Sequence, residues 1–477
     1  MTAWRDHGLD KYVGESNPLT LLVQDALMHS ESKCSIQTNS GSALLPQVKS
    51  FCEQQQSLYG IERGCTCLIV GDDNASTAMA IILCLFCGSS IVLAEENAIE
   101  SNLEGYLSEV SIDFRIRANG KIGASFPAIQ VERLSKSKPK PVDLPEGSLV
   151  MSTSGTSAGG KKGVLLTQKS VFSNLLGILA KQVFRPKVTH VNIIPLTHAF
   201  GLMADLIIPL ALECSVYYSK DVVDYLSAIA RIHPGHLNFP PAVSEVFAKR
   251  LNASQSAHAL GIDNARLLCA GAPMKQWAYD SLRSHGFDCY VGYGLTECSP
   301  CVSLTSTAEI GDETLGSPLF NLEVRINGAD SELLVRGSCL FLGYVTERGL
   351  VPGDIDEAGW LHTGDTAAQD EKNRLRILGR LDDVVVFSDG TKYQARAIEE
   401  SIEGEIAIDA CMAKKHPDRD SWIIEYYADN SESSEQIEAI IRARVAALET
   451  SHTLEEIVRV DSPFESTSAL GKLRRNT

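Results

Sequence analysis

What this sequence lacks removes several classes of protein. Its net charge is −17, so it has no basic surplus of the kind that a general nucleic-acid-binding surface needs. The first residues contain no apolar signal core, and the uncharged stretch at residues 74–94 is interrupted by Gly88-Ser-Ser90. That stretch predicts a buried helix, a turn and a buried strand. We therefore expect a cytoplasmic protein with no membrane span and no nucleic-acid partner.

The sequence also lacks the signals of a disulfide-linked or zinc-binding protein. Most of its 13 cysteines lie in apolar runs, as buried free thiols do. The C-x-x-C pairs Cys84/Cys87 and Cys298/Cys301 could form a zinc site together. Core packing is the better interpretation, because the first pair falls on an apolar predicted helix and the pairs are far apart in sequence. Without a secretory signal we expect no disulfides.

The composition is otherwise that of an ordinary soluble protein. The 477 residues are 44% hydrophobic and 22% charged, enough for about two or three domains with a sizeable core. Strand and helix patterns alternate over residues 61–120, which predicts βαβ units and a mostly parallel, covered sheet. The fold class is therefore α/β.

The most informative stretch is a hydroxyl- and glycine-rich loop at residues 151–163, which contains Lys161 and Lys162. Glycine lets the backbone approach an anion closely, and hydroxyls and an ammonium add donors and charge. Apolar strand-like runs hold both of its ends, so a flexible linker is disfavoured. The spacing from Gly155 to Lys161 fits a Walker A loop, but neither Ser nor Thr follows, and a hairpin is predicted where that loop needs a helix. The loop predicts phosphate binding without predicting a P-loop NTPase.

Further motifs follow predicted strands, at the places where open α/β sheets bind ligands. His198 follows a strand that breaks at Pro195, although a lone histidine is more often structural. The turn at residues 270–273 follows the strand predicted at residues 267–269. Tyr293 stands between two glycines, which suits it to stack on a planar ring. Thr296 offers a donor, and Glu297 offers a hard oxygen ligand for magnesium.

From about Ser331 the sequence pattern changes to short strands separated by turns. The strands are predicted at residues 332–336, 340–344, 360–365 and 375–378. This pattern indicates a small β-rich lobe. A turn at residues 379–383 and a strand at 384–387 then begin a small α/β domain, which ends in the basic segment Gly471–Arg475.

In their order and spacing these motifs resemble the adenylate-forming superfamily of acyl-CoA synthetases, non-ribosomal-peptide adenylation domains and luciferases. The resemblance covers roughly residues 60–475. It rests on the phosphate loop from Thr153 to Gly163, Pro195–Gly201, Ala270–Pro273, Tyr293–Glu297, Thr363–Asp365, Gly379–Arg380 and Gly471–Lys472. It implies an N-terminal core domain at residues 1–380 and a mobile C-terminal domain at residues 381–477, with the hinge at Asp382.

The resemblance also implies a role for each matched residue. Tyr293 and Gly294 would lie against adenine with Gly271, Ala272 and Pro273; Asp365 and Arg380 would bind the ribose; and Thr153, Ser154, Gly155, Thr156, Ser157 and Lys162 would hold the β- and γ-phosphates. Thr296 would contact the α-phosphate, Glu297 would bind magnesium, and Lys472 would reach the carboxylate and the α-phosphate. His198 would gate an acyl pocket that also includes Phe200, Gly201, Phe239 and Gly292.

The implied function is ATP-dependent activation of a carboxylic acid to an acyl-adenylate, with release of pyrophosphate, followed by thioester formation with CoA. Cations at the reacting phosphate would stabilise the charge of the transition state, and no nucleophilic side chain is required. ATP, Mg²⁺ and CoA are the expected cofactors. Phe200 stands where amino-acid-activating members carry an aspartate for the α-amino group. An unpaired buried ammonium is costly, so we expect an aryl or a short to medium acyl acid without that group.

Some positions depart from the family pattern. The phosphate loop is one residue longer, with Lys161 where proline is common; Val386 replaces a lysine; Ser331 replaces a glycine; and the C-terminal motif lacks its proline and arginine. None of these changes removes a charged catalytic group.

Other functions remain open from the sequence. One is a stand-alone ligase that loads the phosphopantetheine of a separate acyl-carrier protein, since no D-S-L-type serine follows Arg475. The acidic surface weakly disfavours an acidic carrier. The others are a non-catalytic nucleotide-binding homologue and a P-loop kinase or ATPase.

Overall fold

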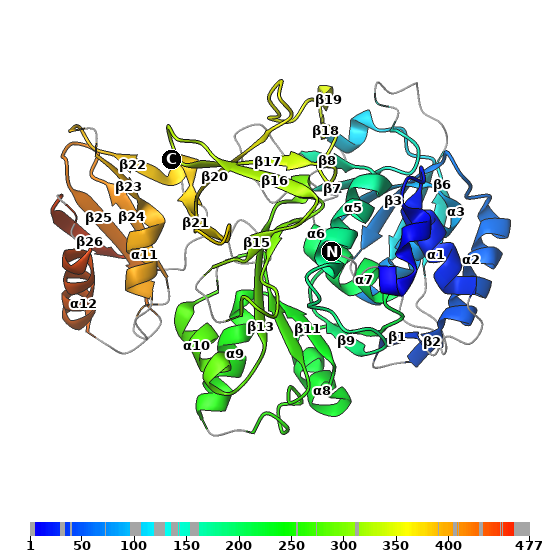
Figure 1. Ribbon diagram of the computed structural model, residues 1–477, viewed down its shortest axis with the longest axis horizontal. Helices are drawn as coiled ribbons and strands as arrows, with labels where there is room; N and C mark the ends of the chain where they lie inside the picture. Colours follow the sequence, from blue (N-terminus) through cyan, green and yellow to red (C-terminus); the bar gives the residue numbers. More distant parts are fainter. Residues whose placement is uncertain are drawn as a thin grey trace.

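The protein is described by a computed structural model of mixed α/β architecture. It describes residues 5–28, 34–38, 41–71, 73–95, 106–118, 129–134, 142, 144–152, 162–253, 256–272, 274–310, 314–389, 391–403, 408, 410–428, 433–448, 450 and 452–461. Figure 1 shows the N-terminal elements at one end of the long axis and the C-terminal elements at the other, with the middle of the chain between them. The α/β fold class predicted from the sequence is confirmed.

One large sheet is built mainly from the N-terminal part of the chain and has the strand order β19-β18-β8-β7-β4-β3-β5-β6. Its centre is parallel, with β3 between β4 and β5 and with β4 next to β7. Both β3 and β4 are mostly apolar and almost entirely buried, as expected of parallel strands with covered faces. The strands are β3 (Thr66–Gly71), β4 (Ser90–Ala94), β5 (Phe114–Ala118), β6 (Gln130–Arg133), β7 (Leu149–Ser152), β8 (Gly163–Leu166), β18 (Gly343–Thr346) and β19 (Gly349–Val351).

Helices complete this part of the core. They are α1 (Pro18–Met28), α2 (Leu45–Tyr59), α3 (Asn74–Cys87) and α5 (Gln168–Leu179). The uncharged stretch forms α3 and then β4: Asp73 caps the first turn of α3 by accepting from the Ser76 amide, and Gly88 ends the helix at φ 72°. No helix in the described ranges is both long enough and apolar enough to cross a membrane. The short helix η3 (Tyr106–Glu109) precedes β5.

A second large sheet has the order β15-β14-β13-β12-β11-β9-β10-β1-β2. Its strands are β1 (Ser35–Thr38), β2 (Gly41–Leu44), β9 (Thr189–Asn192), β10 (Ser215–Tyr218), β11 (His236–Phe239), β12 (Arg266–Cys269), β13 (Cys289–Gly294), β14 (Cys301–Leu304) and β15 (Ser317–Pro318). The helices α8 (Val222–Ile232), α9 (Pro241–Asn252) and α10 (Gln276–Ser284) lie beside it at the bottom of Figure 1. Between β9 and β10 the chain forms α6 (Ala199–Leu202), one π-helical turn η4 (Met203–Ile207) and α7 (Ile208–Ala211).

A smaller antiparallel sheet has the order β16-β17-β20-β21 and agrees with the predicted β-rich lobe. Its strands are β16 (Leu322–Ile326), β17 (Glu332–Gly337), β20 (Leu361–Gln369) and β21 (Leu375–Arg380). One strand assignment in this lobe is wrong. The strand predicted at residues 340–344 is β18, which begins at Gly343 and pairs with β8 in the first large sheet. A strand's partner depends on tertiary contacts that its own residues do not reveal.

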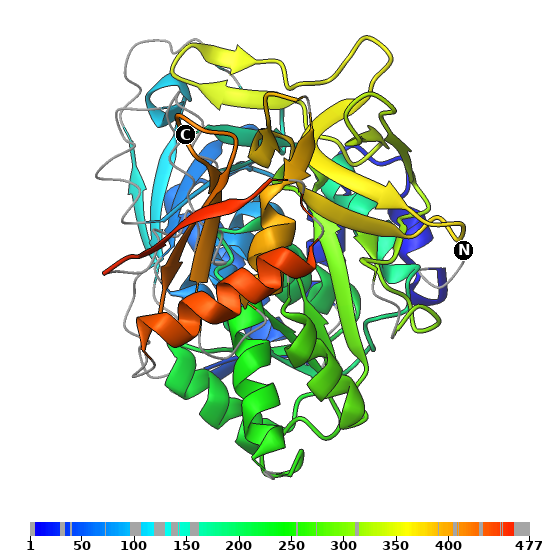
Figure 2. The same cartoon turned by 90° about the vertical axis from the view of Figure 1, so that its left-hand side faces the viewer.

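The C-terminal residues build a separate buried cluster around Trp422 and Tyr426. Its elements are β22 (Val384–Val386), β23 (Lys392–Gln394), α11 (Ala395–Glu403), β24 (Ala410–Lys415), β25 (Trp422–Tyr427), α12 (Ser434–Ala447) and β26 (Leu454–Arg459). Figure 2 looks onto this part, with α12 in front. All 13 cysteines lie in described ranges, and none of them forms a disulfide.

Candidate active site

A tyrosine, an aspartate and an arginine from distant parts of the chain meet at one point. The Tyr293 hydroxyl on β13 donates to Asp365 Oδ2 at 2.6 Å, and Arg380 Nη1 approaches Asp365 Oδ1 at 3.0 Å. Asp365 and Arg380 are direct cross-strand partners in the β20–β21 hairpin, so two motifs separated in sequence become one unit. Asp365 is 6% exposed. Burial, and then the negative Asp365, raise the pKa of Tyr293, so the phenol stays protonated and can donate.

The turn before Asp365 is held by buried contacts. Gly364 has φ +68°, and a Cβ there would meet Arg380 Nη2 at 2.8 Å, so only glycine leaves room for the guanidinium. The Gly364 amide donates to Glu332 Oε1 at 2.9 Å, and the Thr363 hydroxyl donates to the Leu333 carbonyl at 2.7 Å. The aspartate is therefore presented by a rigid turn.

The glycines beside Tyr293 serve packing. A Cβ on Gly294 would lie 1.8 Å from the Pro300 carbonyl, and one on Gly292 would lie 3.0 Å from the Ser303 carbonyl. These positions let β13 pair antiparallel with β14, with an irregularity at Tyr293/Gly294.

Glu297 lies in the short helix η5 (Thr296–Cys298), which also holds Thr296. Its Oε1 accepts from the Tyr344 hydroxyl at 2.9 Å, and Lys162 Nζ stands 5.1 Å from the centre of the Tyr344 ring. Burial, and then Glu297, raise the pKa of Tyr344, so this phenol is also a donor. A carboxylate oriented by a neutral hydroxyl suits a hard cation such as Mg²⁺.

His198 ends a loop that is close to another acid. Its Nε2 lies 3.5 Å from Glu95 Oε1, and the Thr197 hydroxyl donates to the same oxygen at 3.3 Å. Burial lowers the pKa of His198, and Glu95 opposes that shift. The imidazole is therefore neutral near pH 7.

Other predicted residues join this region to different degrees. Gly271 and Ala272 lie just past the end of β12, after Ala270, and Gly292 lies on β13. Phe200 and Gly201 form α6 directly after His198. Phe239 does not join them: its fully buried ring packs on Phe247, with ring centroids 6.0 Å apart, in the second core. Side chains alternate along a strand, so its neighbour Asn238 faces η4 instead.

Several predicted residues lie outside the described residues. They are Thr153, Ser154, Gly155, Thr156, Ser157, Lys161, Pro273, Gly471 and Lys472. The strands that flank the phosphate loop, β7 and β8, are antiparallel neighbours, as the predicted hairpin requires.

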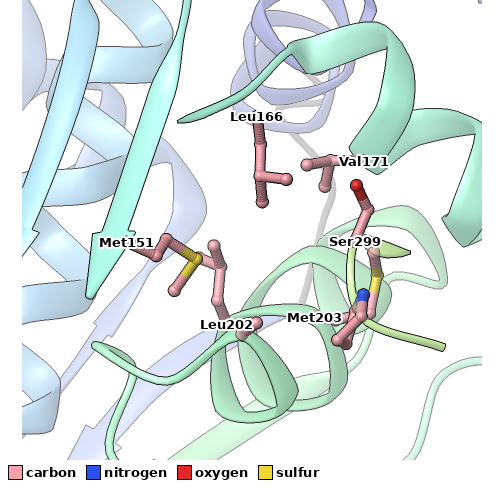
Figure 3. Close-up of a pocket in the computed structure, with 8 residues that line it drawn as sticks. Met151, Leu166, Val171, Leu202, Met203 and Ser299 are labelled. Carbon is pink, nitrogen blue, oxygen red and sulfur yellow. The ribbon is translucent and has the colours of Figure 1, made fainter. Parts of the chain in front are cut away.

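A small cavity lies behind the phosphate-loop strands (Figure 3). Its volume is about 10 Å³, which is near the lower limit for one water. It is lined by Met151, Leu166, Val171, Ala199, Leu202, Met203, Ser299 and Pro300. This void is too small to hold a carboxylic acid substrate.

The sequence did not single out Tyr344 or Glu95. Tyr344 lies in the Gly343–Thr346 strand assigned to the wrong sheet, so its approach to Glu297 could not be foreseen. Glu95 directly follows β4, and the strand-end rule used for the other motifs could have marked it.

Comparison with known proteins identifies the family. The family model described as "AMP-binding enzyme" matches residues 61–345, more than half of the chain. The chain belongs to the AMP-binding enzyme family. This result agrees with the resemblance seen in the motifs, and it places Tyr293, Glu297 and Tyr344 within the matched segment.

Named relatives of this AMP-binding enzyme are CoA ligases. A feruloyl-CoA synthase of Amycolatopsis is 24% identical over 358 residues, which covers 70% of this chain and 72% of the relative. A long-chain-fatty-acid–CoA ligase of Escherichia coli is 28% identical over 272 residues, covering 53% and 48% of the two chains.

Solved structures share the fold. The o-succinylbenzoate CoA synthetase of Bacillus subtilis, in complex with its acyl-adenylate intermediate, superposes with a TM-score of 0.77 at 16% identity and covers 95% of this chain and 96% of its own. The same enzyme in complex with ATP and magnesium gives 0.75 at 17% identity, covering 95% and 98%.

Proposed function

We propose that this AMP-binding enzyme is an acid–thiol ligase. It activates a carboxylic acid with ATP to an acyl-adenylate, releases pyrophosphate, and transfers the acyl group to the thiol of CoA. The observation that carries the proposal is the triad of Tyr293, the buried Asp365 and Arg380 in a chain of this family. The triad joins an aromatic ring to a charged acceptor suited to a nucleoside.

The nucleotide side of the proposal follows from these contacts. A carboxylate offers about four lone-pair sites. The Tyr293 hydroxyl and Arg380 use one on each oxygen of Asp365, which leaves acceptors for ribose hydroxyls. The Tyr293 ring would stack on adenine beside Gly271 and Ala272. Pro273 is proposed from its motif only.

Magnesium fits the residues present. Glu297 supplies a carboxylate oriented by Tyr344, and Lys162 adds a cation on the phosphate side. Glu297 would hold Mg²⁺, and Thr296 would contact the α-phosphate. The ion would add positive charge where negative charge develops in the transition state.

Lys472 is proposed as the cation that reaches both the carboxylate and the α-phosphate, on the strength of its motif. The proposed hinge Asp382 is exposed and lies in the short helix η6 (Leu381–Asp383), between β21 and β22. We place the division between a core domain, residues 1–380, and a mobile domain, residues 381–477, at this point.

The acid is proposed to lack an α-amino group. His198, Phe200, Gly201 and Gly292 would line its pocket, and Phe200 stands where an ammonium would need a carboxylate partner. With Phe200 in the pocket, an aryl or short to medium acyl group fits better than a long chain.

ATP–pyrophosphate exchange over a panel of acids tests the function. We expect exchange with aryl or short to medium acids, such as cinnamate, and none with the matched α-amino acid phenylalanine. Thioester formation with CoA should follow. Release of phosphate in place of pyrophosphate would refute the reaction class, and fastest exchange with phenylalanine would refute the substrate class.

A further inference from the structure

The loop of residues 193–197 leads to His198. A fully buried carboxylate lies next to this loop and has no part in the function proposed above. Asp205, in the π-helical turn η4, is 0% exposed. Pro209 follows four residues later and has no N–H, so the Asp205 carbonyl has no helical donor from that position. The Tyr218 hydroxyl donates to this carbonyl at 2.9 Å instead. Single π-helical turns such as η4 are frequent at functional sites.

One chain of hydrogen bonds runs from the His198 loop to Asp205. The Leu196 backbone N–H donates to Asn74 Oδ1 at 3.0 Å, and Asn74 Nδ2 donates to Asn192 Oδ1 at 2.7 Å. Asn192 Nδ2 then donates to Asp205 Oδ2 at 2.9 Å. Because the first donor is a backbone N–H, neither amide in this chain can be reversed without leaving a donor facing a donor.

A second chain reaches the other carboxylate oxygen from β11. Asn238 Nδ2 donates to Asp205 Oδ1 at 2.7 Å and also contacts the Ala204 carbonyl at 3.2 Å. Asn238 Oδ1 lies 3.0 Å from His236 Nε2, which must be the donor because the amide oxygen only accepts. This second chain also points toward Asp205.

Two chains of donors therefore converge on one side chain. Only a residue that accepts on both sides satisfies them, and a carboxylate does so. Asparagine at this position would turn one NH₂ group toward another NH₂ group. The charge also has a partner: His190 Nδ1 lies 3.8 Å from Asp205 Oδ1. Burial lowers the pKa of His190, but Asp205 and Cys214 raise it to about 9.

The hydrogen bonds that converge on Asp205 hold in place the region proposed to bind the acid. Asn74 anchors the loop of residues 193–197, and the His198 amide donates to the Pro195 carbonyl at 3.0 Å. A Cβ on Gly201 would meet that same carbonyl at 2.4 Å, so α6 sits tightly against the loop. Asn238 ties the end of β11 to the same carboxylate.

We propose that Asp205 is a positioning residue that holds the 193–197 loop against α6 and β11 and so fixes where His198 stands for acid binding. The inference rests on the proposed acid-activating function, because it assigns His198 to the acid side. The nucleotide-side residues Tyr293 and Asp365 lie on β13 and β20 and have no place in either chain.

The test compares Asp205→Asn with a charge swap, Asp205→Asn/Asn192→Asp. In the swap, the amide introduced at position 205 can accept from Asn238 and donate to the carboxylate introduced at position 192, which still accepts from Asn74. The Ile194 carbonyl loses the Asn192 donor at 2.7 Å and faces a carboxylate oxygen in its place, but it keeps Asn74 Nδ2 at 3.3 Å. In ATP–pyrophosphate exchange we expect Asp205→Asn to lower kcat/KM for the acid roughly 10- to 100-fold, as a small misplacement near reacting groups does. The loss should be in KM for the acid, and KM for ATP should stay at the wild-type value. The swap restores both chains but not the bond from residue 192 to the Ile194 carbonyl, so it should recover part of the loss.

Asp224→Asn is the matched control, because Asp224 accepts from the Tyr217 hydroxyl and the Lys220 amide and belongs to neither chain. An unchanged acid KM in Asp205→Asn overturns the proposal. So does an equal rise in both KM values, or a swap that recovers nothing. If the wild type exchanges with no acid, the proposed function fails, and the His198 imidazole NMR signal then decides the positioning role. That signal, assigned with His198→Asn, should move in Asp205→Asn and return in the swap; an unmoved signal refutes it.

Discussion

The Tyr293 hydroxyl offers the sharpest test of the nucleotide site. Tyr293→Phe keeps the ring that would stack on adenine and removes the O–H that donates to Asp365 at 2.6 Å. Tyr293→Ala removes both. Comparing the two variants separates the contribution of the ring from that of the hydroxyl, which no single substitution can do.

The magnitude follows from the bond that is lost. A hydrogen bond to a charged group contributes about 1.5–3 kcal/mol net, and each ~1.4 kcal/mol is a factor of ten in affinity. Arg380 still approaches Asp365 Oδ1 at 3.0 Å, so the carboxylate is not left unpartnered. We therefore expect the lower end, a rise in KM for ATP of about tenfold. In Tyr293→Ala, loss of the base–ring contact adds roughly 1–3 kcal/mol.

The assay is ATP–pyrophosphate exchange at saturating acid, with ATP varied. Tyr290→Phe is the matched control, since Tyr290 is on the same strand and its hydroxyl lies 3.3 Å from Thr307 Oγ1, outside the site. It should leave KM for ATP unchanged. Tyr293→Phe should also reduce discrimination between ATP and 2′-deoxy-ATP. The substitution removes a donor that orients Asp365, and 2′-deoxy-ATP lacks a ribose hydroxyl that would bind Asp365, so both changes affect the same contact.

Two outcomes would refute this reasoning. If Tyr293→Phe matches the wild type while Tyr293→Ala loses ATP binding, the hydroxyl bond has no part in holding the nucleotide. If neither variant changes KM for ATP, Tyr293 does not contact adenine.

Three further predictions follow from other contacts. Tyr344→Phe should weaken Mg²⁺-dependent ATP binding, measured by calorimetry at varied Mg²⁺, because Glu297 loses the donor that orients it; unchanged Mg²⁺ dependence would contradict this. Glu95→Gln removes the charge that opposes burial, so the pKa of His198 should fall further and the imidazole should stay neutral to lower pH in an NMR titration; a rise would refute the pairing. Gly294→Ala should lower the free energy of unfolding in urea by about 1–3 kcal/mol through overpacking, since its Cβ would lie 1.8 Å from a carbonyl.

Local patterns predicted the elements of the fold well, and pairing between distant strands less well. The uncharged run at residues 74–94 was predicted correctly as α3 and β4 because Gly88-Ser-Ser90 interrupts it in sequence, and the structure ends α3 at Gly88. The β18 strand was assigned to the small lobe because nothing in its residues shows that β8 is its neighbour. Register and partner depend on distant contacts.

The candidate site divides in the same way. Motif spacing indicated Tyr293, Asp365 and Arg380, and the structure brings them together. The resemblance implied that Phe239 lies in the acyl pocket with His198, but the alternation of β11 turns its ring into the second core and turns Asn238 toward η4. The role of the glycines around Tyr293 could not be foreseen, because it depends on where the Pro300 carbonyl lies.

Two buried carboxylates show why the nucleotide side and the acid side should respond differently to substitution. Asp365 is 6% exposed and receives one donor on each oxygen, so it keeps accepting capacity for a ligand at the surface of its hairpin. Asp205 is 0% exposed, accepts a hydrogen bond from an asparagine on each carboxylate oxygen, and faces His190. Asp365 can bind a ligand directly, whereas Asp205 can act only through the helices and strands that it joins. Removing the charge of Asp365 should therefore change KM for ATP alone, and removing that of Asp205 should change KM for the acid.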